Sequence, residues 1–486
     1  MLHGMYKRLL KETSLYSLGP LLARVLSLIT VPIYTRILSP ADYGAIDILS
    51  YTAVLVVLFV GAALDQAVAR FYLDASDEVE RKRIASTVLI YYICAFAFLI
   101  PLIKPFARDL AHNWLHGQVA EKTVMLVFIF IWFNGIYYIA NNQLKYLFLS
   151  KQVALCAIGN SLVSVALSLM FVAYYKLGVF GMFLGQVVGA GIFALVALYF
   201  GRRSYALVFH WGVLRRLLHY SLPLVPGSLA YYLMQYIDRF AIKEFISLKE
   251  VGIYGIGARL ASLINLFLTG FHGAWSPTVF KSFRESEAPE RFKVVFNHFL
   301  FIVLVMMLGL SVFGKEILRI LTTKTFSQGF IVVPLLVAAA ILASVGEYFT
   351  YGIRIAQKTH YKLVLNIAIL IMNVVLNYLL IPPLGIIGAA LATATSFLFL
   401  TIVGMAVSQK LYYVPYRWRN IAIAGVLAVA ISNGVTLINT PATWQMIIIK
   451  IGIVAIVVWV IARLLSVHWD KRLSDWIMNR NDRTFD

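Results

Sequence analysis

Arginines inside long apolar stretches are the most unusual feature of this 486-residue sequence. Arg24 lies near the middle of the apolar run 13–35, and Arg259 lies within the run 251–272. A charge at the centre of a bilayer costs about 2.5–3.5 kcal/mol on insertion scales, so each such residue needs a partner or a hydrated cavity. The two arginines therefore indicate that the helices carrying them face something other than lipid.

Other polar residues share faces of the apolar runs at helical spacing. They are Ser27 beside Arg24; Ser228, Tyr231, Gln235, Asp238 and Arg239 in 219–242; Asp47, Tyr51 and Asp65 in 43–67; Ser262 and Thr269 beside Arg259; Asn134, Tyr138, Asn141 and Lys145 in and just after 123–144; and Ser344, Glu347, Tyr351 and Arg354 in and just after 331–351. Such faces predict a hydrated cleft within the membrane body.

Several of these residues have a structural explanation as well. Asp238 and Arg239 lie close to one end of their run, where an ion pair at the membrane interface explains them as well as a functional role does. Asp65, Lys145 and Glu347 could form ion pairs near the cytoplasmic surface.

Four further polar residues have mainly structural explanations. Asp47 lies near the outer surface, where water can solvate it, and Lys450 lies near the start of its run, where it can snorkel. Asn373 and Asn377 are expected to bond neighbouring helices.

The composition shows which elements must position these residues. Apolar residues make up 61% of the chain and charged residues 13%, against about 45–50% and about 25% in ordinary globular proteins. The apolar runs are continuous rather than alternating, and about 20 residues suffice to cross a bilayer. An all-α polytopic membrane protein is therefore expected. Its fourteen predicted spans are 13–35, 43–67, 84–103, 123–144, 153–175, 179–200, 219–242, 251–272, 295–313, 331–351, 363–381, 385–408, 419–438 and 445–465.

The positive charge predicts how the chain is oriented. The 42 Lys and Arg residues outnumber the 22 Asp and Glu residues and concentrate in alternate connections between spans. The positive-inside rule then places both termini in the cytoplasm, which leaves nucleic-acid binding as the weaker explanation of the charge.

Cys94 and Cys156 lie within apolar runs and offer neither a disulfide framework nor a metal site. No connection is long enough for a folded domain, so we expect neither an enzyme nor a bound cofactor.

The chain also repeats itself. The segments LSPADYG and ISLKEVG end at Gly44 and Gly252, which are 208 residues apart, and LGVFG and LGIIG begin 207 residues apart. We therefore expect an N-lobe at 1–201 with six spans, a cytoplasmic amphipathic linker at 202–218, a six-span C-lobe at 219–409, and the last two spans with the tail at 410–486. Parallel lobes of this kind are typical of transporters with a site at the lobe interface. The first two spans of each lobe would line the cleft.

Helix breakers fall at corresponding places in the two lobes. Gly19 and Pro20 are predicted to interrupt the first span, and Pro223, Pro226 and Gly227 the seventh. Interrupted helices at matching positions of two repeats indicate a transporter site or gate, so these residues are the expected hinges.

These features resemble a known family. The 6+6+2 arrangement, the segment RILSPADYG from Arg36 to Gly44, the pair Asp238-Arg239, and the segment VGIY before Arg259 look like the polysaccharide repeat-unit (O-antigen or exopolysaccharide, Wzx-type) flippases of the MOP superfamily, which also holds MATE exporters and lipid II flippases.

The resemblance implies movement of an undecaprenyl-diphosphate-linked oligosaccharide between the leaflets of the bacterial inner membrane, by alternating access through a cationic central cavity. Arginine forks suit phosphate oxygens, and polar amides and hydroxyls suit sugars. The expected substrate-binding residues are Arg24, Arg259, Arg239, Gln235, Tyr231, Ser262, Asn141 and Lys145. A proton, a sodium ion or the membrane potential would drive transport, with Asp238, Asp65 and Glu347 as coupling candidates. Polysaccharide polymerase and chain-length proteins are possible partners.

Two other transporters and one enzyme class remain as alternatives. A lipid II flippase shares the fold and the cationic cavity, although the segment after the first span disfavours it. A MATE-like exporter of cationic drugs would need net negative charge, which Arg24 and Arg259 oppose. A membrane glycan polymerase or ligase would need a long extracytoplasmic loop with catalytic residues, and the spans leave none.

Overall fold

The computed structural model describes residues 2–466 apart from Ser76, Leu207, Gln357, Thr359 and 438–443. The side chains of 2–18, Pro20, Tyr231, His360, Leu363 and Leu437 also lie outside the description. Every regular element within these ranges is a helix, so the expected all-α architecture is confirmed.

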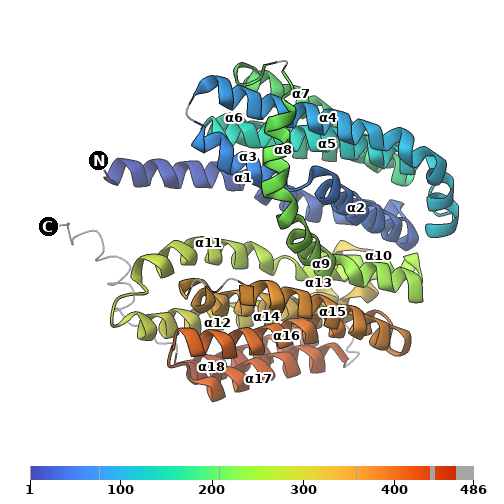
Figure 1. Cartoon of the computed structure of the whole chain (residues 1–486). Coiled ribbons are helices and arrows are strands. Elements are labelled where there is room, and N and C mark those ends of the chain that lie inside the picture. Colours follow the sequence, from blue (N-terminus) through green and yellow to red (C-terminus); the bar gives the residue numbers. More distant parts are fainter. Residues whose placement is uncertain are drawn as a thin grey trace. The chain divides into compact units, whose positions relative to one another are not determined.

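The described α-helices follow one another along the chain and are labelled in Figure 1 where there is room. They are α1 (Leu2–Ile37), α2 (Pro40–Gly61), α3 (Leu64–Asp74), α4 (Glu78–Asp109), α5 (Glu121–Tyr146), α6 (Ser150–Leu169), α7 (Gly178–Gly201), α8 (Trp211–Ser221), α9 (Val225–Phe245), α10 (Leu248–Ala261), α11 (Ile264–Ser282), α12 (Ala288–Val312), α13 (Gly314–Leu321), α14 (Val333–Ile355), α15 (His360–Leu384), α16 (Ile386–Leu411), α17 (Trp418–Leu437) and α18 (Trp444–Leu464).

Most of these helices are suited to a bilayer. Eleven of the described helices are long and apolar enough to cross a membrane, and the bent pair α10–α11 makes a twelfth if it is one span. The chain is therefore a multi-pass membrane protein. The other two predicted spans correspond to α1 and α9, which are not among those helices, and α9 carries four charged side chains between Asp238 and Glu244. The total of fourteen spans and the cytoplasmic termini remain predictions.

Two predicted spans are broken rather than continuous. The predicted span 43–67 consists of α2 and α3, separated by Ala62 and Ala63, which both have φ of 50°. The hydroxyl of Tyr91 donates to the carbonyl oxygen of Val60 at 2.8 Å, which satisfies a backbone acceptor near the end of α2. Helices α10 and α11 likewise meet at a bend of 46°. Alanine favours helix, so sequence alone could not reveal the first break.

The prolines act differently in the two repeats. Helix α8 ends at Ser221, a 3₁₀ turn contains Pro223, and α9 begins at Val225 with Pro226 in its first turn. Helix α1, by contrast, continues through Gly19 and Pro20, so the interruption predicted there is absent from the structure. One proline removes a single backbone bond and can bend a helix without ending it. The hinge role of all five breaker residues stays a prediction.

The segment expected as an amphipathic linker contains α8. Its residues Leu214 and Leu217 are buried, and the helix packs on α3 and α4. Arg216 forms an ion pair with Glu80 at 2.8 Å, while Trp211 is exposed. The position of α8 on a membrane surface stays a prediction.

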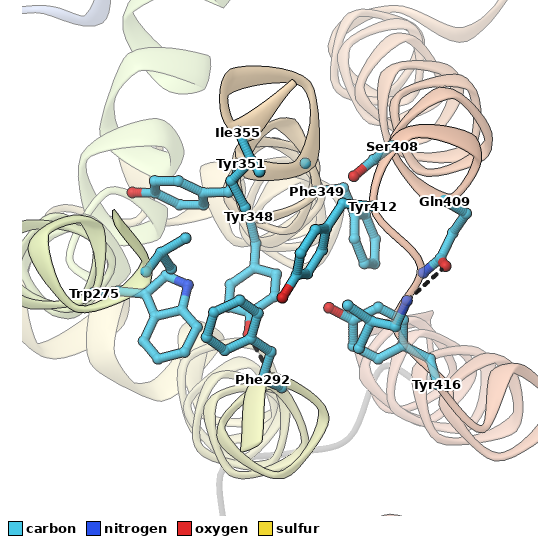
Figure 2. Close-up of a pocket in the computed structure, with 13 residues that line it drawn as sticks. Trp275, Phe292, Tyr348, Phe349, Tyr351, Ile355, Ser408, Gln409, Tyr412 and Tyr416 are labelled. Atoms are coloured by element: carbon cyan, nitrogen blue, oxygen red, sulfur yellow. Dashed lines mark hydrogen bonds between the residues drawn. The ribbon is translucent and has the colours of Figure 1, made fainter. Parts of the chain in front are cut away.

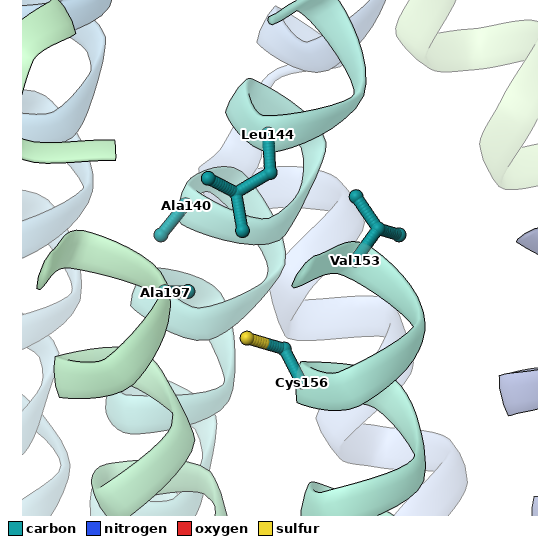
Figure 3. Close-up of a cluster of buried hydrophobic side chains, with 5 residues drawn as sticks. All are labelled: Ala140, Leu144, Val153, Cys156 and Ala197. Atoms are coloured by element: carbon teal, nitrogen blue, oxygen red, sulfur yellow. The ribbon is translucent and has the colours of Figure 1, made fainter. Parts of the chain in front are cut away.

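The chain divides into two compact units. One comprises the residues up to Arg259 together with Leu318–Gly329 and Asn366–Ser396. Within it α4 packs on α5, α5 on α7, α7 on α6, and α6 on α1 (Figure 1). Figure 3 shows that α5, α6 and α7 bury a cluster of mostly small side chains, namely Ala140, Leu144, Val153, Cys156 and Ala197. Small residues let membrane helices approach closely, because lipid provides no hydrophobic force between them.

The second unit comprises Leu260–Ile317, Phe330–Leu365 and the chain from Phe397 onward. Helices α12, α14 and α17 pack together in it, and α18 packs on α12 and α17. Lys450 on α18 is buried and donates to Glu316 at 2.6 Å and to the carbonyl oxygen of Val312 at 3.1 Å. The snorkelling expected for this lysine is therefore wrong, because a carboxylate lies within reach in the protein interior.

The two glycines that end the repeated segments face each other in the first unit. A methyl group at Gly44 would overlap the carbonyl oxygen of Leu248, and one at Gly252 would overlap the carbonyl oxygen of Pro40. Each overlapped carbonyl lies four residues before the opposite glycine, so the contact is reciprocal, as two copies related by a two-fold axis require. We call this contact the α2–α10 crossing.

Replacing Gly252 with alanine should destabilise the protein, because the new Cβ meets backbone that cannot rotate away. Overpacking costs about 1–3 kcal/mol, more than the roughly 0.5–1 kcal/mol that alanine gains over glycine within a helix. Thermal unfolding in detergent measures the effect. The control is Gly452→Ala on α18, where an added Cβ meets nothing within 4 Å. A Gly252→Ala protein as stable as the parent would show that the crossing is not close-packed.

Breaking the buried pair of Lys450 should cost more than removing it. Lys450→Met leaves the Glu316 carboxylate uncompensated, and losses of about 3–5 kcal/mol are typical of such changes. The double variant Lys450→Met/Glu316→Gln should recover most of that loss in the same unfolding measurement. Lys410→Met at the exposed end of α16 serves as the control. Equal stability of the single and double variants would contradict the pairing.

Candidate functional site

Three groups of polar side chains among the described helices contain residues expected at the site. The first, which we call the crossing cluster, lies beside the α2–α10 crossing and joins α2, α9 and α10. Its members are Asp47, Tyr51, Asp238, Arg239, Tyr254 and Arg259.

Arg259 is held by a carboxylate from the other repeat. Its Nη2 donates to Asp47 Oδ1 at 2.9 Å, and its guanidinium carbon lies 4.7 Å from the centre of the Tyr43 ring. A methyl group at Gly255 would overlap Asp47 Oδ2, so the absence of a side chain there makes room for the carboxylate. Arg259 lies in the last turn of α10, where a cation is favoured by the helix dipole.

Arg239 is held within its own helix and by aromatic rings. Its Nη1 donates to Asp238 Oδ1 at 2.7 Å and to the carbonyl oxygen of Gln235 at 3.1 Å. The hydroxyl of Tyr254 donates to Asp238 Oδ2 at 2.5 Å. The rings of Tyr51 and Tyr254 both lie 5.1 Å from the guanidinium carbon, a distance at which a cation is attracted to the ring face.

The charges of the crossing cluster balance. Its two arginines pair with its two aspartates, and both aspartates are only 3% exposed. Some hydrogen-bonding capacity is nevertheless left over: Asp47 Oδ2 and Arg239 Nε are buried and have no hydrogen-bond partner in the described part of the chain. Arg239 and Arg259, two of the arginines expected in a cationic cavity, are thus ion-paired in this structure.

The second group joins α3 and α5. The hydroxyl of Tyr138 donates to Asp65 Oδ2 at 3.0 Å, and that of Tyr146 donates to the Asp65 carbonyl oxygen at 3.3 Å. Lys145 donates to Asn142 at 2.8 Å. Asp65 therefore lies among tyrosine hydroxyls, whereas the sequence suggested an ion pair as its structural explanation.

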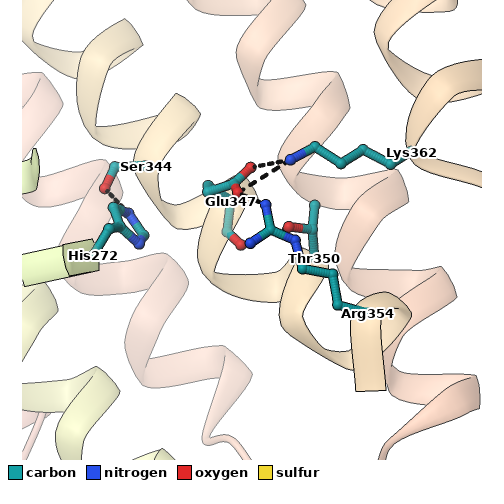
Figure 4. Close-up of polar contacts among 6 residues, drawn as sticks. All are labelled: His272, Ser344, Glu347, Thr350, Arg354 and Lys362. Carbon is teal, nitrogen blue, oxygen red and sulfur yellow. Dashed lines mark hydrogen bonds and ion pairs between the residues drawn. The ribbon is translucent and has the colours of Figure 1, made fainter. Parts of the chain in front are cut away.

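The third group lies in the second unit, on α11, α14 and α15 (Figure 4). Glu347 forms ion pairs with Arg354 and, at 3.0 Å, with Lys362. Nearby on α11, His272 Nε2 lies 2.7 Å from the hydroxyl of Ser344. Because one carboxylate faces two cations, the ion-pair group carries a net positive charge.

An aromatic pocket lies in the same unit (Figure 2). Trp275, Phe292, Tyr348 and residues at the end of α16 line it, and the Gln409 side chain accepts a hydrogen bond from the Val414 amide at 3.0 Å. Burial raises the pKa of the Tyr412 and Tyr416 hydroxyls in the connection after α16. These hydroxyls therefore stay protonated at neutral pH, and Tyr412 donates to the carbonyl oxygen of Phe283 at 3.0 Å.

The remaining predicted site residues lie on α1, α5 and α9 or in the break after α10. Arg24 is exposed on α1 and has no ion-pair partner in the described part of the chain. Ser262 lies in the break between α10 and α11, and the buried Oδ1 of Asn141 has no partner within the described ranges. The side chains of Tyr231 and Pro20 lie outside the described residues.

Asp47 differs from the sequence-based expectation. It was expected to be solvated near the outer surface, whereas the structure buries it against Arg259. The repeat contained a signal for this contact. At the offset of 208, Asp47 corresponds to Gly255 and Tyr51 to Arg259, so one repeat supplies a carboxylate where the other supplies space for it.

Comparisons with known proteins agree with this architecture. Residues 9–283 match the family model described as polysaccharide biosynthesis protein, and residues 223–379 match the MatE model. Two proteins of Haloferax volcanii are similar in sequence. The "probable low-salt glycan biosynthesis flippase Agl15" is 27% identical over 44% of this chain and 48% of its own, and the "probable flippase AglR" is 25% identical over 36% and 38%. The matched segments thus span less than half the length of either relative.

Solved structures share the fold. The lipid II flippase MurJ in an inward closed conformation aligns with a TM-score of 0.73 at 15% identity, over 96% of this chain and 100% of its own. An inward-facing MATE family transporter of the MOP superfamily aligns with a TM-score of 0.64 at 16% identity, over 82% and 94%. Since the first family model covers more than half of the sequence, the chain belongs to the polysaccharide biosynthesis protein family and has the fold of MOP-superfamily transporters.

Proposed function

We propose that this chain is a flippase that moves an undecaprenyl-diphosphate-linked oligosaccharide repeat unit from the cytoplasmic to the outer leaflet of a bacterial inner membrane. Membership of the polysaccharide biosynthesis family and the flippase names of two relatives support a lipid-linked glycan as the cargo. The single observation that carries the proposal is Arg24, an exposed cation without an ion-pair partner among the described residues, on a helix expected to lie in the membrane.

The chemistry of the cargo explains this use of arginine. A diphosphate carries charges whose transfer through hydrocarbon is prohibitive, so it needs fixed cations along its path. Arginine supplies a planar fork that matches two phosphate oxygens at once. Arg24 would receive the headgroup, and Arg239 and Arg259 would join when their carboxylates are displaced. Gln235, Tyr231, Ser262, Asn141 and Lys145 would then bond sugar hydroxyls or phosphate.

The rest of the transport cycle is proposed on the same basis. The lobes 1–201 and 219–409 would alternate between inward and outward access, with the breaks at Pro223 and Pro226 bending. The polyprenyl tail would stay in lipid against α18, which exposes apolar side chains such as Ile448 and Ile456. Asp65, Asp238 and Glu347 would couple the cycle to a proton, a sodium ion or the membrane potential.

A MATE-like exporter is the second candidate, because residues 223–379 match the MatE model. Such a site must attract organic cations, and the exposed cation Arg24 would repel them. A drug-susceptibility panel with and without the gene separates the two functions. Raised drug susceptibility with unchanged surface polysaccharide in the deletion strain would favour the exporter.

Arg24→Gln should lower transport about 10- to 100-fold, since a hydrogen bond to a charged group contributes about 1.5–3 kcal/mol. Surface polysaccharide, and lipid-linked intermediates left in the inner leaflet, measure the effect in a strain carrying only the variant gene. Because Arg24 has no ion-pair partner in the described part of the chain, its loss leaves none of the described carboxylates without a cation.

Arg203→Gln provides the matched control, since Arg203 is exposed in the short 3₁₀ turn after α7 and is outside the proposed site. It should leave export unchanged. Normal export by an Arg24→Gln protein that is inserted at the parental level would remove Arg24 from the mechanism and leave the proposal without its main support.

A further inference from the structure

We propose that Asp47 competes with the anionic headgroup for Arg259. While the site is empty, the Asp47–Arg259 ion pair holds α2 against α10 at the α2–α10 crossing, and we call this fastening the lock. A diphosphate that binds Arg259 in place of Asp47 releases the lock. This inference rests on the proposed function for its trigger. The lock itself depends only on contacts within the first unit.

The geometry of the crossing makes one ion pair control a large contact. The backbones of α2 and α10 touch at Gly44 and Gly252, one turn before Asp47 on the first helix and two turns before Arg259 on the second. The ion pair, with 2.9 Å between Arg259 Nη2 and Asp47 Oδ1, therefore fastens the two helices within one to two turns of the place where their backbones meet. Gly255 lets the carboxylate lie against α10 itself.

The repeat indicates that this fastening is not a packing accident. The glycine contact is reciprocal, as a duplicated ancestor would produce, but the charges are not: Asp47 corresponds to Gly255, and Arg259 corresponds to Tyr51. At both of these positions the two repeats differ in a way that allows the Asp47–Arg259 ion pair to form. One copy supplies the anion and the other supplies both the space for it and the cation.

The electrostatics make the pair replaceable by an anion. Asp47 uses one oxygen for Arg259, while its buried Oδ2 has no hydrogen-bond partner among the described residues. Arg259 retains a partly exposed side chain, at 26%, whereas that of Asp47 is 5% exposed. The Arg259 side chain is therefore more accessible to an incoming anion than the Asp47 carboxylate is.

Losing its cation leaves Asp47 as a charge in a dry contact, which is strongly unfavourable. Among the described residues, the charged and titratable groups that interact with Asp47 are Tyr43, Tyr51, Arg239 and Arg259. Arg239 is already committed to Asp238. Water must therefore reach Asp47, and the simplest route is separation of α2 from α10.

The chemical class of the trigger follows from this competition. The Asp47 carboxylate already lies beside Arg259 and competes strongly with any added anion. A ligand that carries a single negative charge therefore does not displace it. A diphosphate offers several oxygens for a bidentate contact and more negative charge than a monophosphate. We expect inorganic diphosphate to unlock the crossing and inorganic phosphate at equal ionic strength to do so at least tenfold less well.

Distance measurement between spin labels tests the lock. The labels are placed by Ala41→Cys on α2 and Lys249→Cys on α10, in full-length protein carrying Cys94→Ser and Cys156→Ala and reconstituted in lipid nanodiscs. Asp47→Asn should raise the separated population at least tenfold without any anion. Asp47→Glu should keep the helices together, because it restores the pair. Asp74→Asn, at the exposed end of α3, is the matched control and should change nothing.

A second variant guards against misfolding. In Asp47→Asn/Arg259→Gln no buried charge is left uncompensated, and the helices should still separate because the lock is gone. Unchanged distances in this variant and in Asp47→Asn would overturn the lock. Separation in both variants, together with no response of the parent to diphosphate, would keep the lock and overturn diphosphate as its trigger, and with it the headgroup assigned under the proposed function.

Discussion

A charge within apolar helices needs a partner or water, and the ion pairs that meet this constraint organise much of the polar chemistry of the chain. Arg259 lies against Asp47, Arg239 against Asp238, Lys450 against Glu316, and two cations lie against Glu347. The pairs of Arg259 with Asp47, Lys450 with Glu316 and Lys362 with Glu347 join different helices, whereas Asp238 and Arg239 are neighbours in α9. Where the partner is on another helix, the same interaction that neutralises a charge also fixes how two helices pack.

The α2–α10 crossing shows how duplication and charge work together. The glycines permit backbone contact, which apolar side chains of ordinary size would prevent. The symmetry of that contact comes from the repeat. The proposed function needs asymmetry as well, and the crossing supplies it at two pairs of corresponding positions where the repeats differ. Asp47 corresponds to Gly255, and Tyr51 corresponds to Arg259.

Aromatic residues complement these ion pairs. The rings of Tyr51 and Tyr254 both lie 5.1 Å from the Arg239 guanidinium carbon, and the ring of Tyr43 lies 4.7 Å from that of Arg259. Such contacts stabilise a guanidinium without neutralising it. An arginine packed in this way can exchange one anion for another while its ring contacts hold it in place, which suits a site that must bind a headgroup and later release it.

The sequence by itself determined the membrane character, the helical architecture and the repeat, because apolar run length and composition report directly on the solvent around a chain. It also identified the polar faces on which Arg259, Asp238 and Asp47 lie. The sequence did not predict the features that depend on tertiary contacts. The breaks at Ala62-Ala63 and Ser262-Leu263 depend on packing that no local propensity reveals, and α1 continues through a proline expected to interrupt it.

The partners of Asp47 and Lys450 were decided by tertiary structure alone. Asp47 was expected in water and Lys450 at the membrane surface, yet both are buried beside an opposite charge. The physical reason is that the cost of a charge in a bilayer depends on its neighbours within a few ångströms, and those neighbours come from segments as far apart in sequence as residues 47 and 259. Sequence shows which helices must avoid lipid, and only the fold shows which charges meet.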